Sequence, residues 1–190
     1  VALRGDRIVA ITPAGLLATA ESRERIDAQG MVVAPGFIDI QSHSWSSLLI
    51  ADGRVISKVA QGVTTEILGE STTPATSNPD IDSLFAGTDL EDSLTLAKVI
   101  TFRGPRGFGA WLEAMERHGN SVNVGSYLGA STVRAYAMGQ AEGIAGPAQL
   151  DTMRSVVRNA MLDGAFGISS ALIYPPGSYA DTAELIALSR

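Results

Sequence analysis

Hydrophobic positions at the start of the chain follow a pattern typical of short strands and turns. Residues 1–4 and 7–11 are apolar-rich runs separated by Gly5-Asp6, a dipeptide that favours a hairpin turn. A further short strand is predicted over residues 31–33, before Pro35-Gly36 interrupts the pattern. This part of the sequence is therefore expected to form β-structure separate from the rest.

From residue 36 onward, short apolar runs alternate with helical patterns. This alternation is typical of parallel strands joined by crossover helices. The predicted strands are residues 37–40, 64–68, 122–128 and 167–172. Four strand-helix units are half of an eight-unit barrel, and an open half-barrel leaves two sheet edges unpaired, so a missing second half is the simplest explanation. The alternative is a doubly wound sheet, which would normally show a glycine-rich phosphate loop after its first strand, and none is found there.

The clearest helical pattern covers residues 147–163. Pro147 suits the first turn of a helix, and Gly164 can end it in a left-handed conformation. The apolar stripe expected to face the core is Leu150, Met153, Val157, Ala160 and Met161. Two further helices are predicted at residues 53–61 and 132–138. Another is predicted from an apolar face formed by Phe108, Trp111, Leu112 and Met115. A last helix is predicted after Asp181, because residues 181–184 resemble a capping box.

Composition narrows the classes of function. The chain is 45% hydrophobic and 18% charged, which indicates a globular protein, and its net charge of -6 leaves no basic face for nucleic acid. There is no cysteine, so disulfides, thiolate ligands and a cysteine nucleophile are excluded. No apolar run is long enough to span a membrane, and the first residues lack the pattern of a signal peptide. Membrane partners are not expected; the compartment stays open, with the cytoplasm slightly favoured.

Candidate reactive groups were sought where the predicted strands end, because parallel barrels carry their chemistry there. His43 follows the first strand, Glu70-Ser71 the second, and Tyr174 the fourth. No nucleophile-elbow motif surrounds the serines, so serine hydrolysis is not expected. His118, beside Gly119, is predicted to be a helix cap or a surface residue.

Several of these segments carry a specific resemblance. Residues 33–39, followed by His43, resemble the entry strand of the amidohydrolase superfamily, and residues 61–65 resemble its second strand. Within that superfamily the segments 123–134, 163–169 and 174–176 are most similar to the N-acyl-D-amino-acid deacylases. The resemblance covers about residues 1 to 190.

The resemblance implies a fold and a chemistry. Residues 1–35 would belong to a small β-sandwich domain built from both chain termini, and residues 36–190 would form the N-terminal half of a (β/α)₈ TIM-type barrel. One or two zinc ions would activate water against the amide of an N-acyl amino acid or a related small molecule, because zinc lowers the pKa of bound water to about 7. The catalytic residues are expected after Arg190, so the chain is expected to be an N-terminal fragment that is inactive alone. Homo-oligomers are compatible with this class.

Three positions depart from the family pattern. Gln41 stands at the first histidine of the family's His-x-His pair, Glu70-Ser71 replaces a metal-binding cysteine, and Ala130 replaces a histidine. One hypothesis is a metal site rebuilt around His43 and Glu70, with Tyr174, Gln41 and Ser71 binding substrate. The alternative is a lost site, in which His43 is a hydrogen-bonded histidine and Glu70 a solvated carboxylate. That alternative would be a catalytically silent barrel that binds a small acidic or amide ligand.

Overall fold

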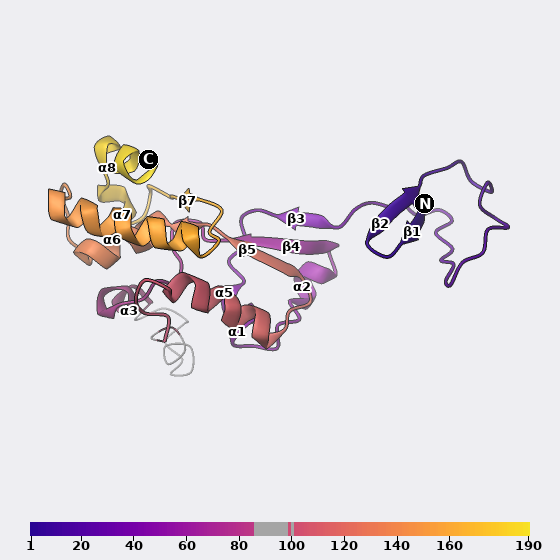
Figure 1. The fold of residues 1–190 in the computed structure, drawn as a ribbon, viewed down its shortest axis with the longest axis horizontal. Coiled ribbons are helices and arrows are strands. Elements are labelled where there is room, and N and C mark those ends of the chain that lie inside the picture. The colour runs from indigo at the N-terminus through magenta and orange to yellow at the C-terminus, as the bar shows by residue number, and fades with distance from the viewer. Residues whose placement is uncertain (86–98, 100) are drawn as a thin grey trace. The chain divides into compact units, whose positions relative to one another are not determined.

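The computed structural model describes residues 1–85, 99 and 101–190, and it divides the chain into two compact units, Val1–Pro35 and Gly36–Arg190. In the first unit, β1 (Ala2–Arg4) pairs antiparallel with β2 (Arg7–Ala10), as the hairpin pattern predicts (Figure 1). The prediction of a strand over residues 31–33 is wrong. Those residues form no strand in the described structure, and Val32 is 92% exposed. β-Branched residues alone do not make a strand without a partner to pair with. A β-sandwich remains a prediction.

The second unit is built on parallel strands. β3 (Phe37–Asp39), β4 (Val63–Leu68) and β5 (Asn123–Ser126) form a sheet in that order, and β6 (Leu128–Gly129) pairs with β7 (Ile168–Ser169). All four predicted strand regions are therefore confirmed, although the third is divided at Tyr127 and the fourth is short. The mixed α/β class is confirmed, and closure into a barrel stays a prediction.

Helices follow the strands along the chain. They are α1 (Trp45–Leu49), α2 (Ile56–Val59), α3 (Pro79–Phe85), α5 (Gly107–His118), α6 (Ala130–Met138), α7 (Pro147–Leu162), the 3-10 turn η1 (Gly177–Tyr179) and α8 (Thr182–Leu188). The sequence analysis did not predict α1 and α3. None of the helices in the described ranges is both long and apolar enough to span a bilayer.

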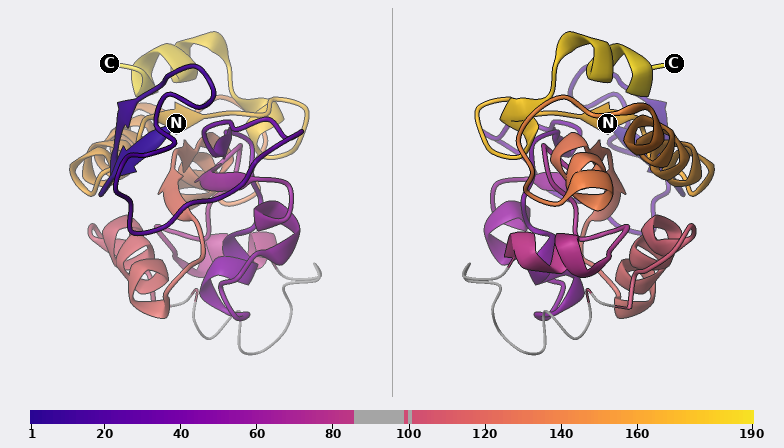
Figure 2. Two further views of the ribbon diagram at one scale, coloured as in Figure 1. Left: turned by 90° about the vertical axis from the view of Figure 1, so that its right-hand side faces the viewer. Right: turned by 90° about the vertical axis from the view of Figure 1, so that its left-hand side faces the viewer.

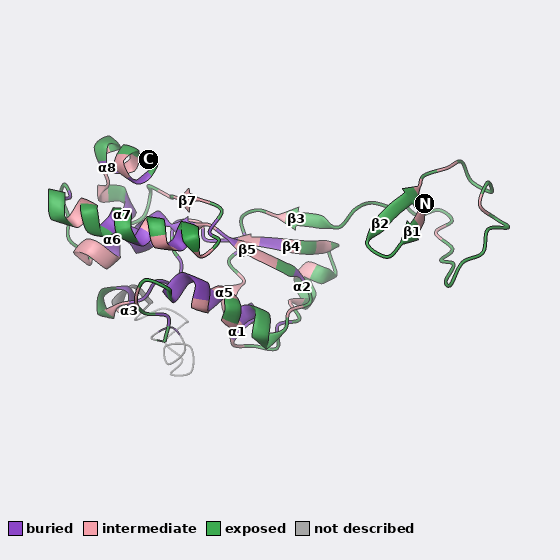
Figure 3. Ribbon diagram, viewed as in Figure 1, coloured by how far each residue is buried: buried purple, intermediate pink, exposed green. Residues whose placement is uncertain are grey.

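The core of the second unit lies between β4 and the helices. Phe108 and Trp111 of α5 are fully buried, with ring centroids 5.5 Å apart in an edge-to-face arrangement, and Leu68 of β4 belongs to the same cluster. Helix α5 packs on α1 and α7, and α7 packs on α6 and α8; α5 and α7 are neighbours in both views of Figure 2. Buried residues are frequent in α5 and α6, whereas α7 buries few residues and β3 is largely exposed (Figure 3).

Helix α7 shows how local sequence sets its ends. The Gly146 amide donates to Gln149 Oε1 at 2.8 Å, which satisfies one of the amides that precede the first helical hydrogen bond. Gly164, with a φ of 102°, follows its C-terminus, as predicted. Met153 and Ala160 are buried, but Met161 is 46% exposed and does not belong to the core face. The prediction of the stripe was therefore right at its centre and wrong at its end.

Two ionic contacts join segments that are distant in sequence, and the first of them is buried on both sides. Arg134 of α6 pairs with Glu184 of α8, and Arg134 also donates to the Gly143 carbonyl. Asp163, beyond the end of α7, pairs with Arg106 and accepts a hydrogen bond from the Gly109 amide at 2.8 Å. Asp163 thus satisfies an amide in the first turn of α5 from another part of the chain.

Candidate metal and substrate site

The chain beyond β3 continues the strand pattern for a few residues. The Ser42 amide donates to the Ile67 carbonyl at 3.0 Å, which extends the ladder between β3 and β4. Ser42 is buried, whereas Gln41 and His43 on either side of it are exposed. This is the alternation of a strand, in which successive side chains point to opposite faces. The side chains of Gln41 and His43 therefore lie on the same, exposed face of the strand.

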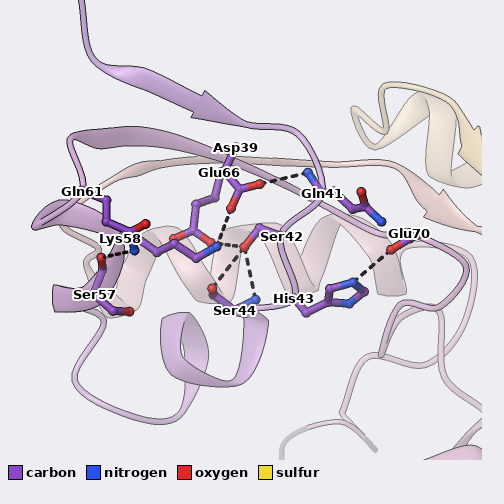
Figure 4. A network of polar contacts seen from close by, with 10 residues as sticks. All are labelled: Asp39, Gln41, Ser42, His43, Ser44, Ser57, Lys58, Gln61, Glu66 and Glu70. Carbon is purple, nitrogen blue, oxygen red and sulfur yellow. Dashed lines mark hydrogen bonds and ion pairs between the residues drawn. The ribbon is translucent and has the colours of Figure 1, made fainter.

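His43 and Glu70 lie in contact at the ends of adjacent strands. The Nε2 atom of His43 is 3.0 Å from Oε2 of Glu70, although the residues are 27 positions apart in the sequence (Figure 4). The His43 side chain is 67% exposed and that of Glu70 30% exposed. A hydrogen bond from the side chain of Gln41, followed by the bond and charge of His43, lowers the pKa of Glu70 below its ordinary value. Three predicted residues thus meet.

Glu70 is held there by the backbone on both sides of it. Gly69 has a φ of 97° and Ser71 a φ of 62°. Both values lie in the left-handed region of backbone conformation, which residues other than glycine rarely adopt. Ser71 is buried, and its Oγ lies 2.8 Å from Oγ of Ser131, whose amide also donates to the Ser71 carbonyl at 2.8 Å. The strained turn is therefore fixed against the start of α6, and Glu70, which is partly exposed, lies at its apex.

A polar network, of which Ser42 and Glu66 are the buried members, lies beside this strand end (Figure 4). Lys58 of α2 pairs with Asp39, and Asp39 Oδ1 accepts from the Gln41 amide at 3.1 Å. These two bonds hold the pKa of Asp39 below its ordinary value, and the same ion pair raises the pKa of Lys58. Glu66 of β4 is fully buried and accepts a hydrogen bond from Ser42 Oγ. The sequence analysis did not single out this network, although an acid inside the apolar run of residues 63–68 was a visible signal.

The other predicted site residues are more dispersed. Tyr174 lies in the loop before η1 with 62% of its surface exposed, and its carbonyl accepts from the Ser178 amide at 2.9 Å. Ala130 is the buried first residue of α6. His118, at the end of α5, has its Nε2 2.7 Å from the Ala51 carbonyl, which agrees with a helix-end role. A substrate-binding role for Tyr174 and Ser71 stays a prediction.

The donor set fits part of a zinc shell. Imidazole nitrogen and carboxylate oxygen are ligand types that zinc prefers, and the donor atoms of His43 and Glu70 are close enough to face one ion. Within residues 1–85, 99 and 101–190, however, no three histidine or carboxylate side chains gather in a way that could hold a metal. His43 and Glu70 could therefore supply two ligands, and a complete shell needs more.

No protein-family model matches the chain. Its sequence is 36% identical to the D-aminoacylase of Alcaligenes xylosoxydans xylosoxydans over 99% of the chain and 37% of that relative. It is 35% identical to the N-acyl-D-aspartate deacylase of the same organism over 98% of the chain and 35% of the relative. The chain thus spans little more than a third of the length of these curated relatives.

Solved structures give the same result. A D-aminoacylase structure described for its binuclear metal centre matches with a TM-score of 0.79 and 34% identity, over 98% of this chain and 37% of that one. The zinc-bound and phosphonate-bound N-acyl-D-glutamate deacylase of Bordetella bronchiseptica matches with a TM-score of 0.68 and 26% identity, over 90% and 34%. Fold and sequence therefore define a homologue of the amidohydrolases. Within them the chain matches the D-aminoacylase type over nearly its whole length, which confirms the resemblance predicted from the sequence.

Proposed function

We propose that this chain contributes to the metal-dependent hydrolysis of an amide, in which water activated by a metal ion attacks the carbonyl of an N-acyl amino acid or a related small molecule. The observation that carries the proposal is the 3.0 Å contact between His43 and Glu70 at the ends of β3 and β4. Had these side chains pointed away from each other, they could not serve one ion. Homology to D-aminoacylases supplies the reaction class.

In this proposal His43 and Glu70 are metal ligands. Zinc, as one or two ions, would polarise the amide carbonyl and lower the pKa of a bound water to about 7. The low pKa of Glu70, caused first by Gln41 and then by His43, keeps this carboxyl ionised and ready to bind a cation. Gln41 has the role of a hydrogen-bonding neighbour that does not replace the missing imidazole, because an amide is a poor zinc ligand.

The remaining assignments concern substrate. Tyr174 is exposed next to Pro175-Pro176, and its hydroxyl could bind the carboxylate of an acyl amino acid. Gln41 is exposed beside Glu70 and has both donor and acceptor atoms for an amide. The hydroxyl of Ser71 is already paired with Ser131, so its contribution to substrate binding would require that pair to open. The half-barrel of residues 36–190 and the β-sandwich contribution of residues 1–35 belong to the same proposal.

Zinc titration of the longer protein that includes this chain tests this proposal, because His43 and Glu70 supply only part of a zinc shell. The chain contains two histidines, so His118→Ala is a matched control for His43→Ala. Stoichiometric zinc binding should be lost or greatly weakened in His43→Ala and Glu70→Ala, and kept in His118→Ala. Amide hydrolysis is expected only from a longer protein that includes this chain, and it should require zinc and Glu70.

The alternative is a silent barrel that binds a small acidic or amide ligand. What favours it is the presence of Gln41 where the family has a histidine, together with the mutual hydrogen bond of His43 and Glu70. A longer protein that is normally folded, contains no metal and binds an N-acyl amino acid without hydrolysing it would establish this alternative and contradict the first proposal.

A further inference from the structure

Ser42 is the link between the exposed site and the buried network. Its amide donates to the Ile67 carbonyl, and its Oγ donates to the carboxylate of Glu66. Its Oγ also lies 3.1 Å from Oγ of Ser44 and accepts from the Ser44 amide at 3.3 Å. Ser42 is 1% exposed, so both its backbone and its side chain are held from inside the protein.

The backbone orientation of Ser42 determines to which face of the strand the side chains of Gln41 and His43 point. Successive side chains of an extended segment alternate between two faces, so a Ser42 side chain fixed inward turns Gln41 and His43 outward. Both of these side chains contact Glu70, His43 through its Nε2 atom and Gln41 through a side-chain hydrogen bond. A small rotation at Ser42 would therefore misalign two groups at once.

Glu66 is an unusual residue for a fully buried position of a β-strand. It is 0% exposed, and its Oε1 atom is buried with no hydrogen-bond partner. Burying a carboxylate is costly, and leaving one oxygen unpaired adds to the cost. Packing would be better served by an apolar side chain, such as Leu68 two residues later on the same face. A functional constraint on Glu66 would explain why the cost is tolerated.

We propose that Glu66 is a positioning residue, which acts through Ser42 to aim His43 and Gln41 at Glu70. The pairing register supports this, because Asp39 lies opposite Glu66 in the neighbouring strand and fixes the Gln41 amide in the same turn. Lys58 pairs with Asp39 and is also stabilised by the charge of Glu66. The two acids thus hold consecutive residues of the turn. The role as a support for a metal ligand rests on the function proposed above.

The test compares several variants by a signal from the His43 ring. Ser42→Ala and Glu66→Leu break the link, Glu66→Gln keeps an oxygen acceptor for Ser42, and Ser126→Ala removes a hydroxyl of similar burial from β5 as a control. The ¹⁵N resonances of the His43 ring are compared with those of Glu70→Ala, in which its partner is absent. His118 in the same spectrum reports on the rest of the fold.

We expect the His43 ring signals of Ser42→Ala and Glu66→Leu to move toward those of Glu70→Ala, with His118 unchanged. Glu66→Gln and Ser126→Ala should keep the wild-type signals. A double variant that combines Ser42→Ala with Glu66→Leu should shift the His43 signals no further than either single substitution does. His43 signals that stay at their wild-type position in Ser42→Ala would overturn the proposal, even if Glu66→Leu fails to fold.

The zinc affinity of the longer protein that includes this chain, with and without each substitution, gives a second measurement. Ser42→Ala should bind zinc about tenfold more weakly than the wild type, as is usual when a residue that orients a ligand is removed. A longer wild-type protein that binds no zinc would contradict the proposed function and leave the ring signals as an independent test of positioning. Weaker zinc binding in Ser126→Ala as well would point to general loosening of the sheet and count against a specific role for Glu66.

Discussion

Arg134 and Glu184 form an ion pair in which both side chains are almost fully buried, 0% and 3% exposed. The residues are 50 positions apart, so the pair ties α6 to α8. Burial raises the pKa of Glu184 above its ordinary value and outweighs the opposing effect of the Arg134 charge. The carboxylate is therefore paired but poorly solvated, and neither partner can be removed without cost.

Removing one partner of this pair should be strongly destabilising. Arg134→Ala leaves a buried carboxylate without its cation and is expected to lower the free energy of unfolding by about 3–5 kcal/mol. Arg154→Ala, which breaks an exposed pair with Asp151 on α7, is the matched control and should change it by less than about 1 kcal/mol. Urea denaturation measures both. Equal effects of the two substitutions would show that burial of the Arg134 pair has no energetic importance.

Asp163 should stabilise the start of α5. Asp163→Ala removes the acceptor for the Gly109 amide and the partner of Arg106, and it is expected to cost about 2 kcal/mol. Asp163→Asn keeps an oxygen acceptor and should cost less. Thermal unfolding followed by circular dichroism measures the difference, and an Asn variant as unstable as the Ala variant would mean that the ion pair, and not the hydrogen bond, is the important contact.

Gly69 should not tolerate a side chain. A Cβ atom there would lie 2.0 Å from the Tyr127 carbonyl oxygen, in addition to the strain of a φ of 97°. Gly164 provides the control, because its φ is 102° and a Cβ would meet nothing within 4 Å. Gly164→Ala should cost about 1 kcal/mol from backbone strain alone, and Gly69→Ala a further 1–3 kcal/mol or so from the clash. Chemical denaturation of the two variants separates strain from clash; equal losses would contradict the predicted clash.

The ion pair of Asp39 and Lys58 should give stability that acid removes. The pKa of Asp39 is lowered in the folded protein, so its contribution is complete above the ordinary carboxyl pKa and is lost as the pH falls through the folded value. The stability difference between wild type and Asp39→Asn is expected to be about 1 kcal/mol near neutrality, since the pair is partly exposed, and to shrink below about pH 4. Unfolding curves at several pH values measure it, and a difference that grows in acid would refute the assignment.

The sequence predicted the strands and the longer helices because their patterns repeat over several turns or alternate cleanly. Helix α7 and the cap at Asp181, which accepts from the Glu184 amide at 2.7 Å, are examples in which local chemistry is sufficient. The strand expected at residues 31–33 failed because pairing depends on a partner that composition does not reveal. Met161 failed for a related reason, since only packing decides where a stripe leaves the core.

At the candidate site, the sequence identified the exposed pair but not its support. His43 and Glu70 were found because parallel strands bring their ends together, which makes the contact a consequence of topology. Glu66 was overlooked although an acid inside a predicted strand is visible in the sequence. Its partner Ser42 can be identified only once the register between β3 and β4 is known. The register shift between Phe37 and Ile38 makes this register hard to deduce from the pattern alone.

The strand order of the parallel sheet also bears on how the chain is made. Each strand after β3 pairs with one that precedes it, β4 with β3 and β5 with β4. A polypeptide leaving the ribosome from its N-terminus can therefore add each strand to a template that has already emerged. The strands that carry His43 and Glu70 pair in the first of these additions, whereas the contact between Ser71 and Ser131 that fixes the Glu70 turn can form only after α6 has followed.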